Sequence, residues 1–152
     1  MKYTLFAIDP GPEKSAFVQW NGSVIDYGHV PNEEMRQLLI GREYDICAIE
    51  MIASYGMAVG ASVFNTCLWV GRFCEIARKE PMLCYRKDIK LFLCKTPRSK
   101  DKDIRQALLK LVGEQGTKTN PGPTYGLASH TWAALAVAVY AQKKVDELNS
   151  ST

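Results

Sequence analysis

Two carboxylates in this sequence stand at the ends of short apolar runs, where a pair of acidic groups could hold a metal ion. Asp9 ends the run LFAID and is followed by Pro10 and Gly11, which turn the chain, and Glu50 ends the run DICAIE. DICAI does not alternate between apolar and polar residues, which favours a central strand buried on both faces. If the two strands are neighbours, their carboxylates lie side by side. They then repel by on the order of 1 kcal/mol or more, and Mg²⁺ or Mn²⁺, which prefer hard oxygen ligands, would relieve the repulsion.

Each carboxylate also has a purely structural interpretation. Asp9 could cap the turn at Pro10 and Gly11, and Glu50 could simply begin a loop. The matching position of both residues at strand ends is what favours a shared metal site over these separate roles.

The first part of the chain predicts three antiparallel strands in meander order, followed by a helix. The strands cover residues 3–9, 15–20 and 23–30. The last two are separated by Asn21-Gly22, which is a strong hairpin signal. The helix that follows begins with Asn32 as its N-cap and ends by Gly41.

The remainder of the chain predicts helices that alternate with two further strands. The strands cover 45–49 and 82–86, and the helices cover 56–79, 101–112 and 129–148, with a short helix or turn at 88–94. The last helix is apolar almost all round (WAALAVAVYA), so we expect it to lie against the core. These elements predict an α/β fold with a five-stranded mixed sheet flanked by helices.

The order of these motifs is similar to that of the RuvC-type Holliday junction resolvases of the ribonuclease H-like superfamily, especially the phage-encoded resolvase-like proteins. The resemblance rests on AIDPG before a hairpin, AIE at the end of the fourth strand, a long helix, a basic loop before an amphipathic helix, and a final ALAVA helix. It extends from Tyr3 to about Gln142. It implies that residues 1–152 form a single ribonuclease H-like nuclease domain. In that sheet, two parallel strands would join the three antiparallel ones.

The resemblance also implies a catalytic site that hydrolyses phosphodiesters with one or two Mg²⁺ or Mn²⁺ ions per subunit. Asp9 and Glu50 match the family's first two metal-binding positions, whereas the usual pair of aspartates in the last helix falls on His130 and Ala133. His130 could be a metal ligand or a general acid or base, and imidazole would favour manganese. Alternatively, His130 only helps to begin the helix beside Ser129.

Positive charge is concentrated in one segment. The whole chain carries only +3, but Arg86 to Lys118 contains ten basic and four acidic residues, a net of +6. Such an excess is typical of a phosphate-binding surface, although many charged runs are simply solvated. The candidate DNA contacts are Arg86, Lys90, Arg98, Lys100, Lys102, Arg105 and Lys118. The resemblance implies a functional lysine near Lys100 or Lys102, which would stabilise transition-state charge. Tyr55 could stack on an unpaired base.

Several classes of protein are disfavoured. No apolar run is long enough for a membrane span, and the N-terminal region does not fit a signal peptide, so we expect a soluble protein in the cytoplasm of a bacterial cell or a phage-infected host. Five cysteines without a C-x-x-C pair predict free thiols. Sugar-kinase and actin-like ATPases place a similar Asp-x-Gly loop on ATP, but 152 residues are too few for their two lobes, so we expect no nucleotide cofactor.

The leading hypothesis is a structure-selective, metal-dependent DNA endonuclease that resolves four-way (Holliday) junctions or related branched DNA. Cutting both strands of a symmetric junction calls for two active sites, so we expect a homodimer formed through the helix at 56–79. Two alternatives stay open: a catalytically weak protein that binds branched DNA, and a ribonuclease H-like nuclease acting on RNA or an RNA–DNA hybrid.

Overall fold

The fold is built on one mixed sheet. The computed structural model describes residues 1–151. Its strands are β1 (Leu5–Asp9), β2 (Lys14–Trp20), β3 (Val24–Pro31), β4 (Ile46–Met51) and β5 (Met82–Tyr85), in the order β3-β2-β1-β4-β5. The first three pair antiparallel, and β4 and β5 are parallel to β1. The predicted five-stranded sheet, with three antiparallel strands and two parallel ones, is confirmed.

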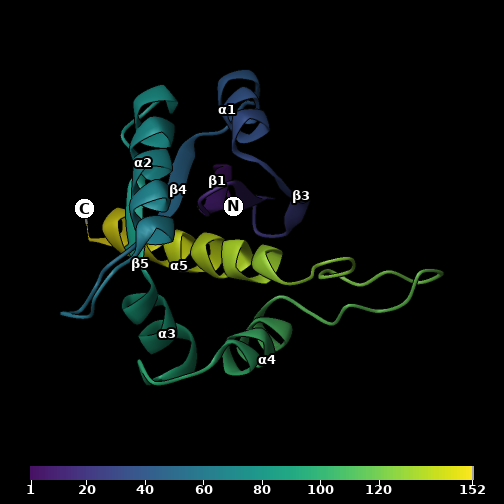
Figure 1. Cartoon of the computed structure of the whole chain (residues 1–152). Coiled ribbons are helices and arrows are strands. Elements are labelled where there is room, and N and C mark those ends of the chain that lie inside the picture. Colours follow the sequence, from purple (N-terminus) through teal and green to yellow (C-terminus); the bar gives the residue numbers. More distant parts are fainter. Residues whose placement is uncertain (152) are drawn as a thin grey trace.

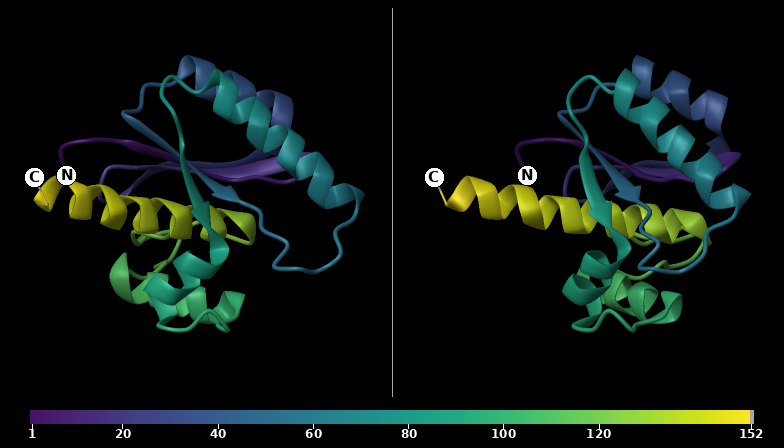
Figure 2. Two further views of the ribbon diagram at one scale, coloured as in Figure 1. Left: turned by 90° about the vertical axis from the view of Figure 1, so that its left-hand side faces the viewer. Right: turned by 60° about the vertical axis from the view of Figure 1, so that its left-hand side comes forward.

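Helices cover both faces of this sheet. One face carries α1 (Asn32–Gly41) and α2 (Ala61–Ile76), and the other carries α5 (His130–Ser150), with α3 (Arg86–Cys94) and α4 (Asp101–Leu111) beyond it (Figures 1 and 2). Side chains of β1 alternate between the two layers. Leu5 and Ala7 belong to the core on the α5 side, whereas Phe6 and Ile8 belong to the core on the α1 and α2 side.

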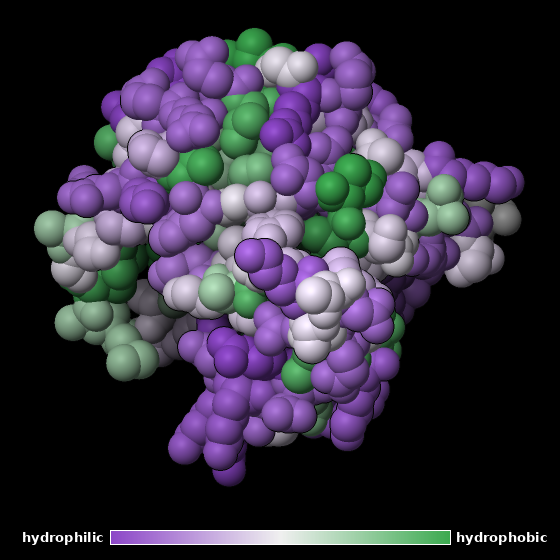
Figure 3. Space-filling view, turned by 90° about the vertical axis from the view of Figure 1, so that its right-hand side faces the viewer, coloured by the Kyte–Doolittle hydropathy of each residue, from purple (hydrophilic) through white to green (hydrophobic). Residues whose placement is uncertain are grey.

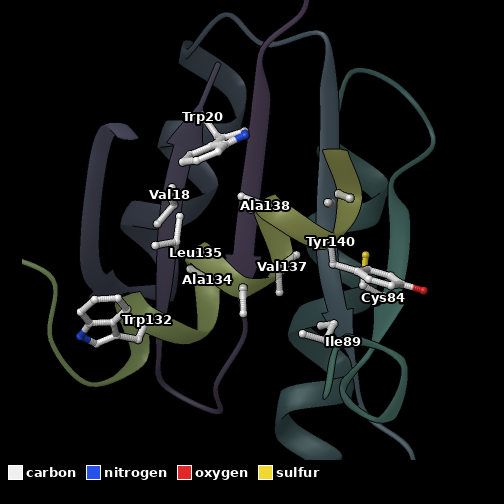
Figure 4. Close-up of a cluster of buried hydrophobic side chains, with 14 of the residues drawn as sticks. Val18, Trp20, Cys84, Ile89, Trp132, Ala134, Leu135, Val137, Ala138 and Tyr140 are labelled. Atoms are coloured by element: carbon white, nitrogen blue, oxygen red, sulfur yellow. The ribbon is translucent and has the colours of Figure 1, made fainter. Parts of the chain in front are cut away.

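The central part of α5 is buried because it is covered from two sides. Leu135, Ala138 and Tyr140 of this helix lie in one cluster with Val18 and Trp20 of β2 (Figure 4). On its other side α5 meets α3 and α4, so Ile89 of α3 belongs to the same cluster. This double coverage explains the apolar residues all round the helix and confirms the expectation that it lies against the core.

The start of α2 differs from the prediction. The helix begins at Ala61 rather than near residue 56: Tyr55 and Gly56 form a turn with positive φ angles of 50° and 81°, and the N-cap Gly60 is still extended. A left-handed pair of residues cannot continue a right-handed helix. Tyr55 therefore lies in an exposed loop between β4 and α2 and does not begin the helix.

Asn32 is not the N-cap of α1. The N-cap is Pro31, and the buried Asn32 side chain points instead to the turn after Asp9. Its Nδ2 donates to the Gly11 carbonyl at 3.0 Å, and its Oδ1 accepts from the Ser15 hydroxyl at 2.6 Å. The Ser15 hydroxyl in turn accepts from the Gly11 N–H. The turn that follows Asp9 is thus held by one buried amide.

Replacing this amide should loosen the turn. We expect Asn32→Ala to lower the free energy of unfolding by about 1 to 3 kcal/mol, because it leaves buried polar partners unsatisfied. Urea unfolding of the variant and the wild type measures the difference. Asn65→Ala is the control, since Asn65 is exposed on α2. Equal stability of the wild type and Asn32→Ala would show that the turn does not depend on this residue.

A β-hairpin between α4 and α5 projects from the body of the molecule (Figure 1). Gly116 and Pro121 form a bridge, and Thr117 and Asn120 exchange backbone hydrogen bonds at the tip. Gly116 has a φ of 68°, and a Cβ there would lie 2.4 Å from the Asn120 carbonyl oxygen, so the turn requires glycine. The face of the molecule on this side is mainly hydrophilic (Figure 3).

Two further expectations are settled by the structure. All five cysteines are free, as predicted; Cys47 and Cys84 are buried and the other three partly buried. Among residues 1–151, no helix is both long enough and apolar enough to span a bilayer.

Candidate active site

The sheet register brings Asp9 and Glu50 together. In the parallel pair β1 and β4, Ala7 lies opposite Ala48 and Ile8 opposite Ile49, so the next residues along are Asp9 and Glu50. Ala7 and Ala48 both face α5, and side chains two residues apart in a strand share a face. Both carboxylates therefore emerge on the α5 face of the sheet. Their side chains interact directly, as the strand-end interpretation predicted.

Burial makes this pair costly to ionise. The side chains of Asp9 and Glu50 are only 10% and 14% exposed. Desolvation raises the pKa of Asp9 above its ordinary value. Desolvation, followed by repulsion from Asp9, raises the pKa of Glu50 to about 7, although Arg86 opposes the shift. Two carboxylates that resist ionisation together are a typical environment for a divalent cation.

His130 lies against Asp9. It is the first residue of α5, and its Nδ1 is 3.0 Å from Asp9 Oδ2. The preceding residue, Ser129, has a φ of 49°, which sets the direction in which the chain enters the helix. Trp132 and Thr131 are buried behind it and fix the helix end against the core. The His130 side chain itself is 59% exposed, so it can meet a ligand in solution while touching Asp9.

A second histidine, His29, joins the site and was missed by the sequence analysis. Its ring centroid lies 5.0 Å from that of His130. Desolvation, then the neighbouring His130 and Lys14, lower the pKa of His29. The sheet explains its position: Asp9 lies opposite Ala16, and Ala16 lies opposite His29, so the three residues form one row across β1, β2 and β3. The Asn21-Gly22 turn alone would not have found it, because a register shift between Gln19 and Trp20 changes which residue of β3 lies opposite Ala16.

Arg86 binds Glu50 from the other side. It begins α3 directly after β5, and its Nη1 is 3.2 Å from Glu50 Oε1. Its Nη2 makes a short ion pair with Asp101, the first residue of α4. Burial of the guanidinium lowers the pKa of Arg86, but Glu50 and Asp101 together raise it above its ordinary value. Arg86 is therefore a charged link between the sheet and α4.

Two cavities meet at these carboxylates. One, of about 430 Å³, lies between the sheet edge and α4 and is lined by Arg86, Asp101 and Arg105 as well as Ala133. The other, of about 510 Å³, lies toward α2 and includes His29 and Lys14. Asp9, Glu50 and His130 line both. The three candidate metal-binding residues thus lie between the two cavities.

The other candidate DNA contacts lie outside these cavities. Lys100 and Lys102 are exposed on either side of Asp101 at the start of α4, and neither lines a cavity with the carboxylates. Arg98 is exposed in the loop before α4, Lys90 is partly buried on α3, and Lys118 is exposed at the tip of the hairpin. Of the basic residues singled out from the sequence, the structure brings Arg86 and Arg105 next to the carboxylates.

The residues present fit a divalent cation by their chemistry. Asp9 and Glu50 offer hard oxygen atoms and excess negative charge, and His130 adds a nitrogen ligand beside Asp9. Within residues 1–151, no group of three or more His, Cys, Asp or Glu side chains is placed so that it could hold a metal ion. The site is therefore an open pair of carboxylates with one adjacent imidazole.

The fold belongs to a known class. The five-stranded mixed sheet flanked by helices matches the fold of RuvC. A structure of RuvC from Thermus thermophilus superposes with a TM-score of 0.66 at 14% identity, covering 93% of this chain and 96% of that one. The T. thermophilus RuvC complex with a Holliday junction substrate gives a TM-score of 0.63 at 14% identity, with the same coverage. No protein-family model and no curated sequence matches the chain.

Proposed function

We propose that this protein is a structure-selective DNA endonuclease that uses a divalent metal to resolve four-way junctions or related branched DNA. The observation that carries the proposal is the buried pair of Asp9 and Glu50, held side by side at one sheet edge and flanked by His130. This pair stands on a RuvC-like fold beside the most basic segment of the chain. Residues 1–152 then act as a single nuclease domain.

Asp9, Glu50 and His130 would hold one or two Mg²⁺ or Mn²⁺ ions. A divalent cation bound there supplies Lewis-acid activation of the phosphodiester and of the attacking water. Asp9 and Glu50 would hold this cation at the carboxyl ends of β1 and β4. Nδ1 of His130 contacts Asp9, so its Nε2 is the nitrogen that can bind a cation or carry a proton.

The basic segment would bind the DNA backbone. Arg86 and Arg105 stand in the cavity next to the carboxylates, where they can contact the phosphates that flank the cut. Lys100, Lys102, Arg98 and Lys90 extend this positive surface over α3 and α4, and Lys118 extends it to the hairpin. Such contacts position a branched duplex without reading its sequence. Tyr55, 60% exposed in the loop after β4, is available to stack on an unpaired base.

The proposed homodimer would form through α2. Phe64 and Leu68 lie one turn apart on this helix and are 63% and 53% exposed. Two exposed apolar residues at this spacing make a stripe that a second copy of α2 can cover. A two-fold axis there would present two sites to the two strands of a junction.

Cleavage of a labelled four-way junction tests the proposal directly. With Mn²⁺ present, we expect paired nicks near the crossover and no cut in a linear duplex of the same sequence. An RNA–DNA hybrid and single-stranded RNA in the same assay test the ribonuclease alternative. Cleavage of the hybrid alone would replace the junction proposal.

Junction binding without metal-dependent nicking would favour the non-catalytic alternative. One observation supports this second candidate: Ala133 stands where the resemblance implies an acidic residue, and it lines the same cavity as the two carboxylates. Binding should in either case weaken steeply with salt, because phosphate contacts release counterions.

A further inference from the structure

A third acidic residue, Asp101, lines the same cavity as Ala133, with its side chain 85% exposed. Both residues line the cavity beside Asp9 and Glu50, although Asp101 begins α4 and Ala133 lies one turn into α5. The methyl group of Ala133 can bind no cation. Asp101 is joined to Glu50 through Arg86, whose two terminal nitrogens pair with one carboxylate each. The cavity therefore contains a third carboxylate, contributed by a different helix.

Capping of α4 does not explain why residue 101 is acidic. Acidic residues are common in the first turn of a helix because they favour the positive end of its dipole. In α4, Asp103 already serves this purpose, since its Oδ2 accepts the backbone N–H of Lys100 at 2.9 Å. The Asp101 carboxylate pairs instead with Arg86, whose other nitrogen is bound to Glu50.

Arg86 thus lies between two carboxylates of the cavity and pairs with both. Its guanidinium contacts both Glu50 and Asp101 and spans strand β4 and helix α4. It neutralises one charge of a group that contains three carboxylates, so negative charge remains for a second cation. A divalent ion carries twice the charge of a guanidinium and would compete with it for carboxylate oxygen atoms.

We propose that Asp101 is a third carboxylate ligand of the metal site, replacing from α4 the acidic residue absent at Ala133, and that Arg86 is an internal counter-ion which a divalent cation must displace. This inference rests on the proposed metal site of Asp9 and Glu50. Displacement frees the Arg86 guanidinium beside the reacting phosphate. Metal binding and the presentation of a phosphate-binding arginine are then one event.

Calorimetric titration with Mn²⁺ alone, without DNA, tests this competition. We expect Arg86→Gln to lower the Kd for Mn²⁺ by about three- to tenfold, because the competing cation is gone, and Asp101→Asn to raise it by about tenfold. The control for the first variant is Lys87→Gln, which removes the same charge from the next residue. Asp88→Asn is the control for the second, because Asp88 is an exposed acidic residue in the first turn of α3.

A double variant tests the replacement itself. If Asp101 replaces the acidic metal ligand that is missing at position 133, an aspartate at that position should compensate for its loss. Ala133→Asp in the Asp101→Asn background should then restore the Kd for Mn²⁺ to within about threefold of the wild type. A Kd that stays at the value of Asp101→Asn overturns the replacement. Thermal unfolding in EDTA confirms that each variant is folded before it is titrated.

The outcomes separate this inference from the proposed function. If the wild type binds Mn²⁺ and cuts junctions, but Arg86→Gln and Asp101→Asn both bind Mn²⁺ as their controls do, the inference is overturned and the nuclease proposal stands. Weaker binding by Arg86→Gln also overturns it, because a competitor cannot strengthen binding. If the wild type neither binds Mn²⁺ nor cuts, the nuclease proposal itself fails.

Discussion

Asp9→Asn should abolish junction cleavage while leaving junction binding almost intact. Asp9 is the carboxylate that touches both Glu50 and His130, so its loss removes the charge at the centre of the site. Asparagine keeps the shape of the side chain but cannot neutralise a divalent cation. We expect the rate of nicking with Mn²⁺ to fall by about a thousandfold or more, in keeping with the loss of several kcal/mol of transition-state stabilisation.

The measurement is the single-turnover cleavage rate of a labelled four-way junction, paired with gel-shift binding of the same junction in EDTA. Asp26→Asn is the control, because Asp26 lies on β3 and its carboxylate pairs with Arg42 rather than with any residue of the site. It should cleave at the wild-type rate. Wild-type cleavage by Asp9→Asn would show that the proposed mechanism is wrong.

The sheet and the carboxylate pair follow from local sequence signals. Asn21-Gly22 sets the hairpin, and the unbroken apolar run before Glu50 indicates a central strand. Once β4 lies next to β1, the alternation of side chains along a strand places Asp9 and Glu50 on the same face. His130 could be placed only through the resemblance, because its contact with Asp9 joins residues that are 121 positions apart.

The remaining features depend on tertiary contacts that no local pattern encodes. Asn32 has the sequence context of an N-cap, yet its amide is used to hold the turn at Gly11, because burial makes those hydrogen bonds worth more than a cap at the surface. In the sequence, Arg86 is only one of the ten basic residues between positions 86 and 118. Its contact with Glu50 and Asp101 arises only when α3 and α4 fold back toward the sheet edge.

Glu50→Gln should make the protein more stable near neutral pH while removing its nuclease activity. Burial, followed by repulsion from Asp9, raises the pKa of Glu50 from 4.5 in a free side chain to about 7 in the folded protein. Between these two values the folded state holds a proton that the unfolded state has released. The free energy of unfolding of the wild type therefore falls as the pH rises from about 4.5 to about 7, by on the order of 2 to 3 kcal/mol.

Glutamine is neutral at every pH, so the free energy of unfolding of the variant does not fall over this pH range. We expect its free energy of unfolding in EDTA to exceed that of the wild type by on the order of 2 kcal/mol at pH 8, and the two proteins to be nearly equal at pH 4.5. Urea unfolding at both pH values measures the difference. Glu80→Gln is the control, because Glu80 is exposed between α2 and β5 and should give the same difference from the wild type at both.

Adding Mn²⁺ at pH 8 should make the wild type more stable than Glu50→Gln. A cation that binds only the folded protein stabilises it, by about 2.7 kcal/mol at a hundred times its Kd. Only the wild type retains both carboxylates, so it alone should gain this increment. A Glu50→Gln variant that is less stable than the wild type in EDTA at pH 8 would contradict the prediction. It would mean that the ion pair with Arg86 outweighs the cost of burying Glu50 beside Asp9.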